Sequence, residues 1–265
     1  MSVDVAVIPA AGRGTRMRPA TRVVPKALMT VLDRPAIQYA VEEAARAGAN
    51  EAIVIVDLDA GHLVAQHFNL GGPLPGLEGV HIRPVVQEEP LGLGHAVLEA
   101  LHMVGDRAFF CLLSDNIVRP GMDVLPALAA GSGDGAVSVV CLRSLEDAML
   151  ERYGVVVPAS EIEGRYLDLG GAVEKPGVTA APSRLGLVGR YLFTPEIFSI
   201  LDKLTPGFGG EIQLTDAINQ LGVNGRLRGY VADQDLLDVG TPEGLLQASV
   251  CLGRDRFGPG VLDGF

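Results

Sequence analysis

The chain has 265 residues, of which 48% are hydrophobic, and a formal net charge of −11 at pH 7. A sequence of this length and composition can bury a full core and is not intrinsically disordered. The negative charge argues against a nucleic-acid or anionic-membrane surface, because phosphates would be repelled over most of the protein. We therefore expect neither as a partner, and no apolar run approaches the roughly 20 residues that span a bilayer.

The cysteines favour a reducing compartment. Cys111, Cys141 and Cys251 are an odd number and widely spaced, and the first two lie in apolar runs. A zinc site would need closely spaced pairs. The N-terminal residues read as a strand, without the basic start and small-residue cleavage site of a signal peptide. We expect buried thiols in a cytoplasmic protein.

The first half of the sequence alternates between strand and helix patterns. Strands are expected at 3–10, 51–57, 82–87 and 107–115, and helices at 34–48, at 63–68 and from about 95 to 105. The helix at 34–48 carries apolar residues at helical spacing and closes on Gly48. The stretch 69–80 is rich in turn residues and predicts a connection. Such alternation implies a parallel sheet covered on both faces.

After about residue 135 the pattern changes to shorter strands joined by turns. Strands are expected at 135–143, 153–159, 166–176, 184–195 and 228–233, and helices at 195–204, 211–222 and 241–253. We expect an α/β fold with a doubly wound, mostly parallel, Rossmann-like sheet. A mixed segment then completes this sheet and forms one wall of a cleft. Residues 254–265 lack periodicity, and we expect a tail that is loosely held or used in a subunit contact.

The loop "AAGRGTRM" at 10–17 follows the first strand, where α/β sheets bind ligands. Gly12 and Gly14 lack side chains, so backbone N–H groups can approach a phosphate closely. A dinucleotide fingerprint would need a glycine in place of Met17, and no Walker Gly-Lys-Ser/Thr follows. On the glycines alone, a structural turn is favoured. The stretch 11–34, however, holds six basic residues and one acid, which favours a polyphosphate ligand.

Four further residues stand at promising positions. Lys26 follows Pro25, whose rigid backbone suits a lysine that serves as a point charge for phosphate, and the chain holds only three lysines. Asp115 ends an apolar strand at the rim of the sheet, and Asp238 precedes a Gly-Thr-Pro turn. Each aspartate taken singly is better explained as a cap or turn residue. Gln87 also ends a strand and can both donate and accept hydrogen bonds.

The stretch "VAVIPAAGRGTRMRPATRVVPKALMTVLDRPAIQY" resembles the N-terminal signature of bacterial UTP–glucose-1-phosphate uridylyltransferases, within the sugar-1-phosphate nucleotidyltransferase superfamily. The resemblance continues, in order, through "VVQEEPLGLGHAV", "LLSDNIV", "GAVEKP", "LVGRYLF", "GEIQLTDAI" and "DVGTPEGLLQA". It extends from about Val5 to Leu252, which is nearly the whole chain. Each piece alone is modest, and the ordered set is specific.

This resemblance implies a fold, a reaction and a cofactor. The fold is that of the nucleotide-diphospho-sugar transferases, a single domain over 1–253 with a nucleotide-binding half to about 135 and an interleaved sugar-phosphate-binding half at about 136–240. The reaction joins UTP and glucose 1-phosphate into UDP-glucose and pyrophosphate, with Mg²⁺. The attacking phosphate oxygen is already ionised near pH 7, so the reaction needs charge neutralisation, in-line alignment and a metal, and no general base.

The resemblance also implies roles for individual residues. The catalytic set is Arg16, Lys26, Asp115 and Lys175, and Asp115 and Asp238 hold the metal. The nucleotide contacts are Ala10, Ala11, Gly12, Gly14, Thr15, Arg16, Gln87, Gly92 and Gly94, with Gln87 at the uracil. The sugar contacts are Gly171, Glu174, Lys175, Val188 and Gly189, although a salt bridge alone would also explain Glu174 and Lys175. The roles of Glu211 and Gln213 stay open, and Glu211 could simply favour a helix N-terminus. The five histidines show no metal-ligand spacing and are expected to be surface or helix-packing residues.

Two alternatives remain open from the sequence. The same chemistry could use dTTP, or another hexose or cyclitol 1-phosphate, because one phosphate-binding machinery serves many bases and sugars. The second alternative is a non-catalytic regulator that binds nucleotide sugars. Four residues suited to catalysis occur together and argue against it: Lys26, Asp115, Asp238 and Lys175. We expect a homo-oligomer, a dimer or a tetramer, although the connection at 69–80 is shorter than in many relatives.

Overall fold

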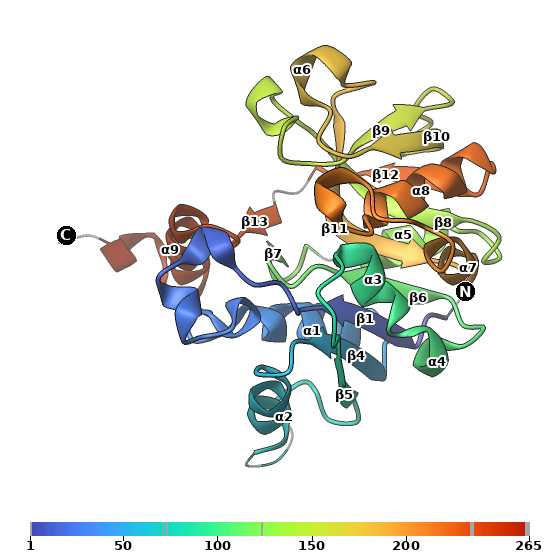
Figure 1. Cartoon of the computed structure of the whole chain (residues 1–265). Helices are drawn as coiled ribbons and strands as arrows, with labels where there is room; N and C mark the ends of the chain where they lie inside the picture. Colours follow the sequence, from blue (N-terminus) through green and yellow to red (C-terminus); the bar gives the residue numbers. More distant parts are fainter. Residues whose placement is uncertain (1, 71, 73, 123, 234–235, 263–265) are drawn as a thin grey trace.

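A nine-stranded sheet runs through the part of the chain that the computed structural model describes, which is residues 2–70, 72, 74–122, 124–233 and 236–262 (Figure 1). The strands lie in the order β5-β4-β1-β6-β11-β8-β12-β10-β9. Their bounds are Val5–Pro9 (β1), Glu51–Val56 (β4), His81–Val86 (β5), Phe109–Leu112 (β6), Ser138–Ser144 (β8), Val155–Pro158 (β9), Tyr166–Val173 (β10), Leu185–Phe193 (β11) and Leu227–Val231 (β12).

The direction of the strands divides the sheet into two parts. Strands β5, β4, β1 and β6 are parallel to one another. Strand β11 is antiparallel to β6 and β8, β8 is parallel to β12, and β10 is antiparallel to both β12 and β9. The parallel sheet predicted before residue 135 is confirmed, and the mixed segment predicted after it contains both antiparallel pairs and the parallel pair β8–β12, so the sheet as a whole is mixed rather than mostly parallel. Parallel neighbours need long crossover connections, whereas the short connection between β9 and β10 allows an antiparallel pair.

Helices cover the sheet on both faces (Figure 1). Their bounds are Ala36–Arg46 (α1), Gly61–Asn69 (α2), Leu93–Leu98 (α3), Leu101–Val104 (α4), Leu125–Gly131 (α5), Gly177–Ala180 (α6), Glu196–Leu201 (α7), Leu214–Val223 (α8) and Pro242–Phe257 (α9). The single helix expected from about 95 to 105 is divided into α3 and α4, because the backbone bonds from Ala100 to Val97 and from Met103 to Ala100 span three residues and tighten the turn. None of the described helices has the length and apolar character needed to cross a membrane.

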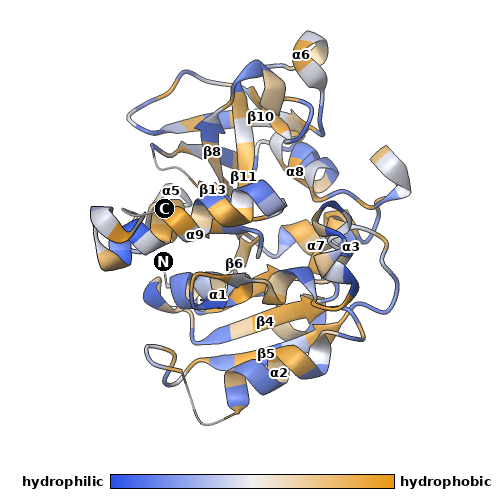
Figure 2. Cartoon of the chain, turned by 90° about the vertical axis from the view of Figure 1, so that its left-hand side faces the viewer, coloured by the Kyte–Doolittle hydropathy of each residue, from blue (hydrophilic) through white to orange (hydrophobic). Residues whose placement is uncertain are grey.

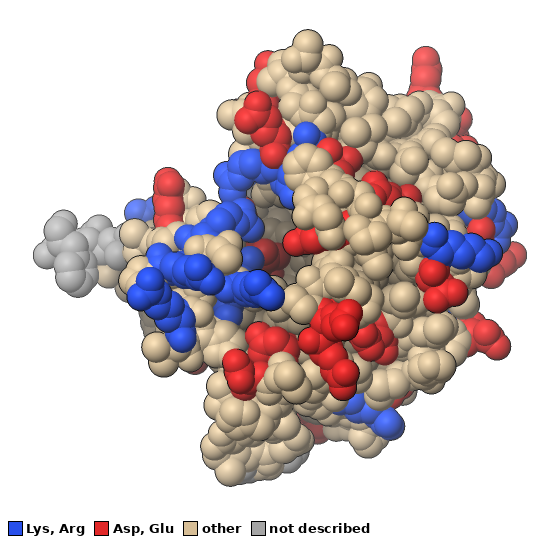
Figure 3. Space-filling view, viewed as in Figure 1, with Lys and Arg blue, Asp and Glu red and all other residues tan. Residues whose placement is uncertain are grey.

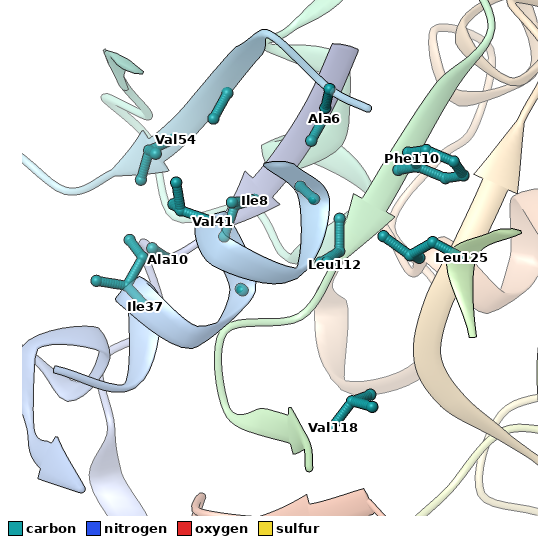
Figure 4. Packing of buried hydrophobic residues seen from close by; sticks show 14 of the residues in the cluster. Ala6, Ile8, Ala10, Ile37, Val41, Val54, Phe110, Leu112, Val118 and Leu125 are labelled. Carbon is teal, nitrogen blue, oxygen red and sulfur yellow. The ribbon is translucent and has the colours of Figure 1, made fainter. Parts of the chain in front are cut away.

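Alternation along β1 builds the core on both sides of the sheet. Ala6 and Ile8 pack with Ile37 and Val41 of α1 in one cluster, which Figure 4 shows from close by. Val5 and its alternate neighbours enter a second cluster with α3, α7 and α8. Figure 2 shows the apolar character of β4 and β11 that this two-sided burial requires. A strand buried on both faces reads as a continuous apolar run, which is why the sequence predicts β1 well.

Two short ladders lie outside the main sheet, and the sequence did not predict them. Strand β7 (Asn116–Val118) pairs antiparallel with β13 (Leu236–Asp238), and β2 (Thr30–Val31) pairs with β3 (Arg34–Pro35). Helix α5 was also not predicted. Between β1 and β2 the chain makes three short 3₁₀ turns: η1 (Thr15–Met17), η2 (Ala20–Arg22) and η3 (Lys26–Leu28).

The C-terminal segment is more regular than its sequence suggests. Helix α9 continues through 254–257, and a 3₁₀ turn, η6, follows at Pro259–Leu262. The N-terminus of α9 is capped by Thr241, whose hydroxyl oxygen accepts a hydrogen bond from the Gly244 N–H at 3.1 Å. Of the predicted tail, 263–265 lie outside the described residues, as do 71 and 73 of the connection at 69–80.

Candidate active site

A first cavity of about 480 Å³ opens at the carboxyl ends of β1, β5 and β6. Because these strands belong to the parallel part of the sheet, their ends meet at the same edge. The predicted residues that line this cavity are Ala10, Ala11, Gly12, Gly14, Thr15, Lys26, Gln87, Gly92 and Asp115. Figure 3 shows the surface hollowed in this region. The fold thus gathers most of the predicted nucleotide contacts around one space.

A second cavity of about 290 Å³ adjoins the first. It is lined by the predicted residues Arg16, Asp115, Glu174, Lys175, Gly189, Glu211, Gln213 and Asp238. The two linings share Leu93, Leu113, Asp115 and Glu211, so Asp115 stands at the boundary. A ligand in one cavity would therefore meet a ligand in the other beside this carboxylate.

Asp115 and Asp238 are brought together by the β7–β13 ladder. Asn116 and Asp238 are register partners, and the Val239 N–H donates to the Asp115 carbonyl at 2.8 Å. The Asp115 carboxylate forms an ion pair with Lys26. The Asp238 carboxylate accepts from the Gly240 N–H at 2.8 Å, and its other oxygen lies 3.2 Å from an Arg152 nitrogen. Two carboxylates far apart in sequence thus become neighbours.

Arg16 and Lys26 converge on the same point from the other side. A methyl group built on Gly240 would lie 2.9 Å from Asp238 Oδ1, 3.1 Å from Arg16 Nη2 and 3.2 Å from Lys26 Nζ. All three atoms are side-chain ends, so the distances place Arg16, Lys26 and Asp238 around Gly240, and a methyl group there would require the Asp238 carboxylate to shift. The result is a compact group of two cations and two carboxylates at the junction of the cavities.

Basic side chains also gather at the rim of the hollow, and of the arginines in the first loop Arg13 lines the first cavity and Arg16 the second. Figure 3 shows basic side chains gathered along one side of the hollow, on the side where Figure 1 places the segment between β1 and α1. In the described part of the chain, no carboxylate forms an ion pair with Arg13, Arg16, Arg18 or Arg22. Cations without acid partners retain their charge for a ligand. This rim is the local positive region that the sequence predicts within an acidic protein.

Glu174 and Lys175 follow β10 at the second cavity. They form an ion pair at 2.9 Å, as the salt-bridge alternative required, and both side chains also line the cavity. The Thr215 hydroxyl donates to Glu174 at 2.6 Å and fixes that carboxylate. Lys175 has a φ of +46°, in the left-handed region that non-glycine residues seldom adopt. Such strain tends to gather at ligand sites.

A tyrosine that the sequence did not single out also faces Asp238. The Tyr153 hydroxyl lies 3.5 Å from the Asp238 carboxylate. Burial, followed by the negative charge of Asp238, raises the pKa of Tyr153. The phenol therefore keeps its proton at neutral pH and can donate a hydrogen bond in the second cavity, which it lines together with Arg152 and Thr215.

Three predicted contacts lie elsewhere. Gly94 lies in α3, where its N–H donates to the Ile212 carbonyl at 2.8 Å. Gly171 packs against α8, and a methyl group on it would lie 2.2 Å from Asn219 Oδ1. The Val188 side chain is buried in the core. None of these three lines either cavity. Close packing of α3 and β10 explains the two glycines, and alternation along β11 turns Val188 away.

Arg190 is the most consequential residue that the sequence analysis missed. It is completely buried, and its guanidinium donates to the carbonyls of Leu113, Gly189 and Asn116 and to the Glu43 carboxylate. Leu113 and Asn116 flank Asp115, so Arg190 holds the loop that presents this carboxylate. The signal was an arginine inside the otherwise apolar run "LVGRYLF", since such a residue must find buried partners.

Comparison with known proteins identifies the family. The family model described as nucleotidyl transferase matches residues 5–254. The chain belongs to this family. A curated nucleotidyl transferase of Staphylococcus saprophyticus, named UTP–glucose-1-phosphate uridylyltransferase 2, is 37% identical over 94% of the chain and 91% of its own length. The Bacillus subtilis protein named UTP–glucose-1-phosphate uridylyltransferase is 38% identical over 94% of the chain and 90% of its own length.

Solved nucleotidyl transferase structures agree with these relatives. A UDP-glucose pyrophosphorylase solved as a complex with UDP-glucose matches with a TM-score of 0.89 and 30% identity, over 96% of this chain and 100% of that chain. A UTP-bound enzyme of Acinetobacter baumannii matches with a TM-score of 0.81 and 34% identity, over 96% and 94%. The resemblance to bacterial UTP–glucose-1-phosphate uridylyltransferases that the sequence predicted is confirmed. The mixed α/β fold is that of a nucleotidyl transferase.

Proposed function

We propose that this nucleotidyl transferase forms UDP-glucose and pyrophosphate from UTP and glucose 1-phosphate. The observation that carries the proposal is the pair of cavities that meet at Asp115, with Arg13 and Lys26 in the lining of one and Arg16 and Lys175 in the lining of the other. Two anions can be held side by side in such a site, each against its own cations. The names of the relatives support uridine and glucose as the base and the sugar.

In this proposal the first cavity takes UTP. The backbone N–H groups of the loop that holds Gly12 and Gly14 approach the phosphates, and Gln87 meets the base. Gly92 has a φ of +111°, and a methyl group on it would lie 2.7 Å from the Glu211 Cβ atom. The missing side chain therefore lets this wall of the cavity pack closely against Glu211. Arg16 and Lys26 lie where the triphosphate would pass between the two cavities.

The second cavity takes the sugar phosphate. The Lys175 ammonium is placed to hold the phosphate, and the Glu174 carboxylate, fixed by Thr215, accepts hydrogen bonds from sugar hydroxyls. Gly189 has a φ of +77°, and a side chain there would collide with Leu113 and the Asn116 amide. The absent side chain lets β11 pack closely on the loop around Asp115, and Gly189 itself lines the cavity.

The reaction is a displacement at the α-phosphorus of UTP. An oxygen of the sugar phosphate attacks, a new P–O bond forms, the bond to the β-phosphate breaks, and pyrophosphate leaves with the electron pair. The attacking oxygen is ionised at neutral pH, so no residue is needed to remove a proton. Arg16 and Lys26 neutralise the charge that gathers on the phosphates, and the site acts by alignment and electrostatics.

Asp115 and Asp238 are proposed to hold Mg²⁺. In the described ranges no group of three or more His, Cys, Asp or Glu side chains could bind a metal by itself. Two adjacent carboxylates fit Mg²⁺, which commonly takes one or two protein carboxylates and completes its shell with water and substrate phosphates. When bound, the ion would neutralise phosphate charge. Lys26, now paired with Asp115, would then be free to turn to the phosphates.

A pyrophosphate-release assay tests this function. Wild-type protein is incubated with each of several nucleoside triphosphates and sugar 1-phosphates, with and without Mg²⁺. We expect release with UTP and glucose 1-phosphate in the presence of Mg²⁺. Preference for dTTP or another sugar phosphate would change the substrate and keep the chemistry. Absence of release with every pair would leave only a binding protein.

The proposed Mg²⁺ site is tested by comparing one aspartate variant in the site with a control aspartate variant on the surface. Asp115→Asn should raise the Mg²⁺ concentration needed for half-maximal rate, because it removes a charged ligand. Asp106→Asn, at an exposed turn residue after α4, is the matched control and should leave the titration unchanged. A Mg²⁺ titration of Asp115→Asn that overlays the wild type would reject Asp115 as a ligand.

We further propose that the protein acts in the cytoplasm as a homo-oligomer. The three cysteines are free, and two of them are buried, which suits a reducing compartment. Val23, Leu246 and Phe257 are 85%, 66% and 60% exposed, and such apolar side chains on a loop and on α9 favour a subunit contact. Light scattering after size-exclusion chromatography would test this, and a monomeric mass at micromolar concentration would reject it.

A further inference from the structure

We infer that His95 and Glu99 fix which hydrogen-bonding face Gln87 presents to the base, and that the site thereby excludes cytidine nucleotides. This inference rests on the proposed function, in that it places the base of the triphosphate beside Gln87 in the first cavity. It concerns histidine and glutamate side chains that the reaction itself does not use. Three side chains lie in sequence from the surface to the cavity: Glu99 beside His95, and His95 hydrogen-bonded to Gln87.

The Gln87 amide has a defined orientation. The side chain is buried, and its Nε2 atom lies 3.2 Å from the Gly92 carbonyl oxygen and 2.9 Å from His95 Nδ1. A carbonyl oxygen can only accept, so the amide atom that faces Gly92 must be the NH₂ group. Reversing the amide would place two oxygens against each other. The Gly92 carbonyl thus identifies the nitrogen and the oxygen of the amide.

The ring of His95 follows from this orientation. Because the Gln87 NH₂ group donates toward Nδ1, that ring nitrogen must accept, and the proton of a neutral ring lies on Nε2. The Nε2 atom lies 3.4 Å from a Glu99 carboxylate oxygen, so the negative charge of Glu99 favours a proton on this ring nitrogen. His95 and Glu99 are four residues apart on one helical turn, and the Glu99 N–H donates to the His95 carbonyl at 3.1 Å. Helix α3 therefore sets the distance between the His95 and Glu99 side chains.

Both N–H donors of Gln87 are then in use, one on Gly92 and one on His95. None of the described residues donates to its oxygen, Oε1, so this acceptor is what the side chain can offer a ligand in the first cavity. Uracil presents an N3–H donor on its pairing edge and can bond to Oε1. Cytosine presents an unprotonated N3 at the same place, so in the pose that suits uracil two acceptors would face each other, and its N4 amino group could reach Oε1 only after the base shifts in the cavity.

The orientation of the Gln87 amide does not distinguish every pair of bases. Thymine has the N3–H of uracil, so the Gln87–His95–Glu99 chain does not separate dTTP from UTP. It separates bases whose pairing edge donates at N3 from those that accept there. Loss of the His95 acceptor would remove one of the two bonds that hold the Gln87 amide, and only the Gly92 carbonyl would then oppose the reversed orientation, which becomes less costly. The NH₂ group would then reach a base acceptor.

The test compares substrates within each variant. The measured quantity is the ratio of kcat/KM for UTP to kcat/KM for CTP, with glucose 1-phosphate and saturating Mg²⁺. His95→Leu removes the acceptor, and we expect this ratio to fall about tenfold, the value of one hydrogen bond. His95→Asn can place an amide oxygen near the former Nδ1 position and should recover most of the ratio. His102→Leu, on the exposed surface of α4, is the matched control and should keep the wild-type ratio.

A purely structural role for His95 would lower both rates together and leave the ratio unchanged, and that result would overturn the inference. If His95→Leu does not fold, Glu99→Leu carries the test, since loss of the carboxylate releases the ring tautomer and should lower the ratio in the same direction. Absence of pyrophosphate release by the wild type would overturn the proposed function alone. Calorimetric Kd values of UTP and CTP, measured without sugar phosphate, would then decide the inference by the same ratio.

Discussion

Replacing Arg190 with methionine is expected to lower the free energy of unfolding by about 3–5 kcal/mol. Methionine is unbranched and fills much of the volume of the arginine stem, so the change removes chiefly the guanidinium. Arg190 and Glu43 are 0% and 1% exposed, and their closest atoms are 2.9 Å apart. Without the arginine, a buried carboxylate loses this cation.

The carbonyl groups add to the cost. Arg190 donates to the Leu113 and Gly189 carbonyls at 3.0 Å each, and also to the Asn116 carbonyl. Buried acceptors left without a donor are unfavourable, so the upper part of the range is expected. For a chain of this length each kcal/mol shifts Tm by about 2–4 °C, and the whole change therefore amounts to about 6–20 °C.

Thermal and urea denaturation measure the effect. Arg226→Met is the matched control: this arginine lies on the surface, is 45% exposed and pairs with Glu196 at 3.3 Å, so its loss should cost less than about 1 kcal/mol. Glu43→Gln combined with Arg190→Met should cost less than the sum of the single changes, because the buried charge goes with its partner. A decrease for Arg190→Met no larger than that for Arg226→Met would refute the reasoning.

Three other outcomes are expected. Lys26→Ala should lower kcat about 100-fold or more and leave the urea midpoint nearly unchanged. Lys203→Ala, at an exposed lysine, is the control, and equal kcat values for the two variants would remove Lys26 from the mechanism. Gly92→Ala should cost about 1–3 kcal/mol, because φ is +111° and the new methyl would lie 2.8 Å from the Ile212 carbonyl; an unchanged urea midpoint contradicts this. A thiol reagent at neutral pH should modify Cys251 quickly and the two buried thiols only on unfolding, since burial raises their pKa values, and three fast thiols would be inconsistent with the fold.

Much of the fold could be predicted because its signals are local. The buried strands are apolar runs, and α1 shows its helical period and its closing glycine. The β7–β13 ladder could not be predicted in this way. Each strand is three residues long, and its partner lies more than a hundred residues away, so neither stretch contains a pattern of its own. The sequence predicted a mixed segment after residue 135 but not which strands pair parallel and which antiparallel, because each pairing depends on partners far away along the chain.

The same distinction between local signals and long-range contacts applies to the residues of the candidate site. Residues such as Lys26 and Asp115 belong to recognisable motifs, and the sequence predicted them. Arg190 and His95 belong to motifs too, but their partners are residues that only the fold brings near. The glycines show another limit of motifs, since both Gly92 and Gly94 pack against Ile212 and only Gly92 also lines the first cavity.

The sequence by itself determined the family, the parallel half of the sheet and the placing of positive charge beside a glycine loop in an acidic chain. These properties depend on residues that are close together along the chain. Only the tertiary structure decided that Asp238 lies beside Asp115, that Arg190 holds the loop between Leu113 and Asn116, and that the Gln87 amide nitrogen lies against Gly92 and His95. Each of these depends on a hydrogen bond between groups whose meeting is set by packing, and no local pattern records it.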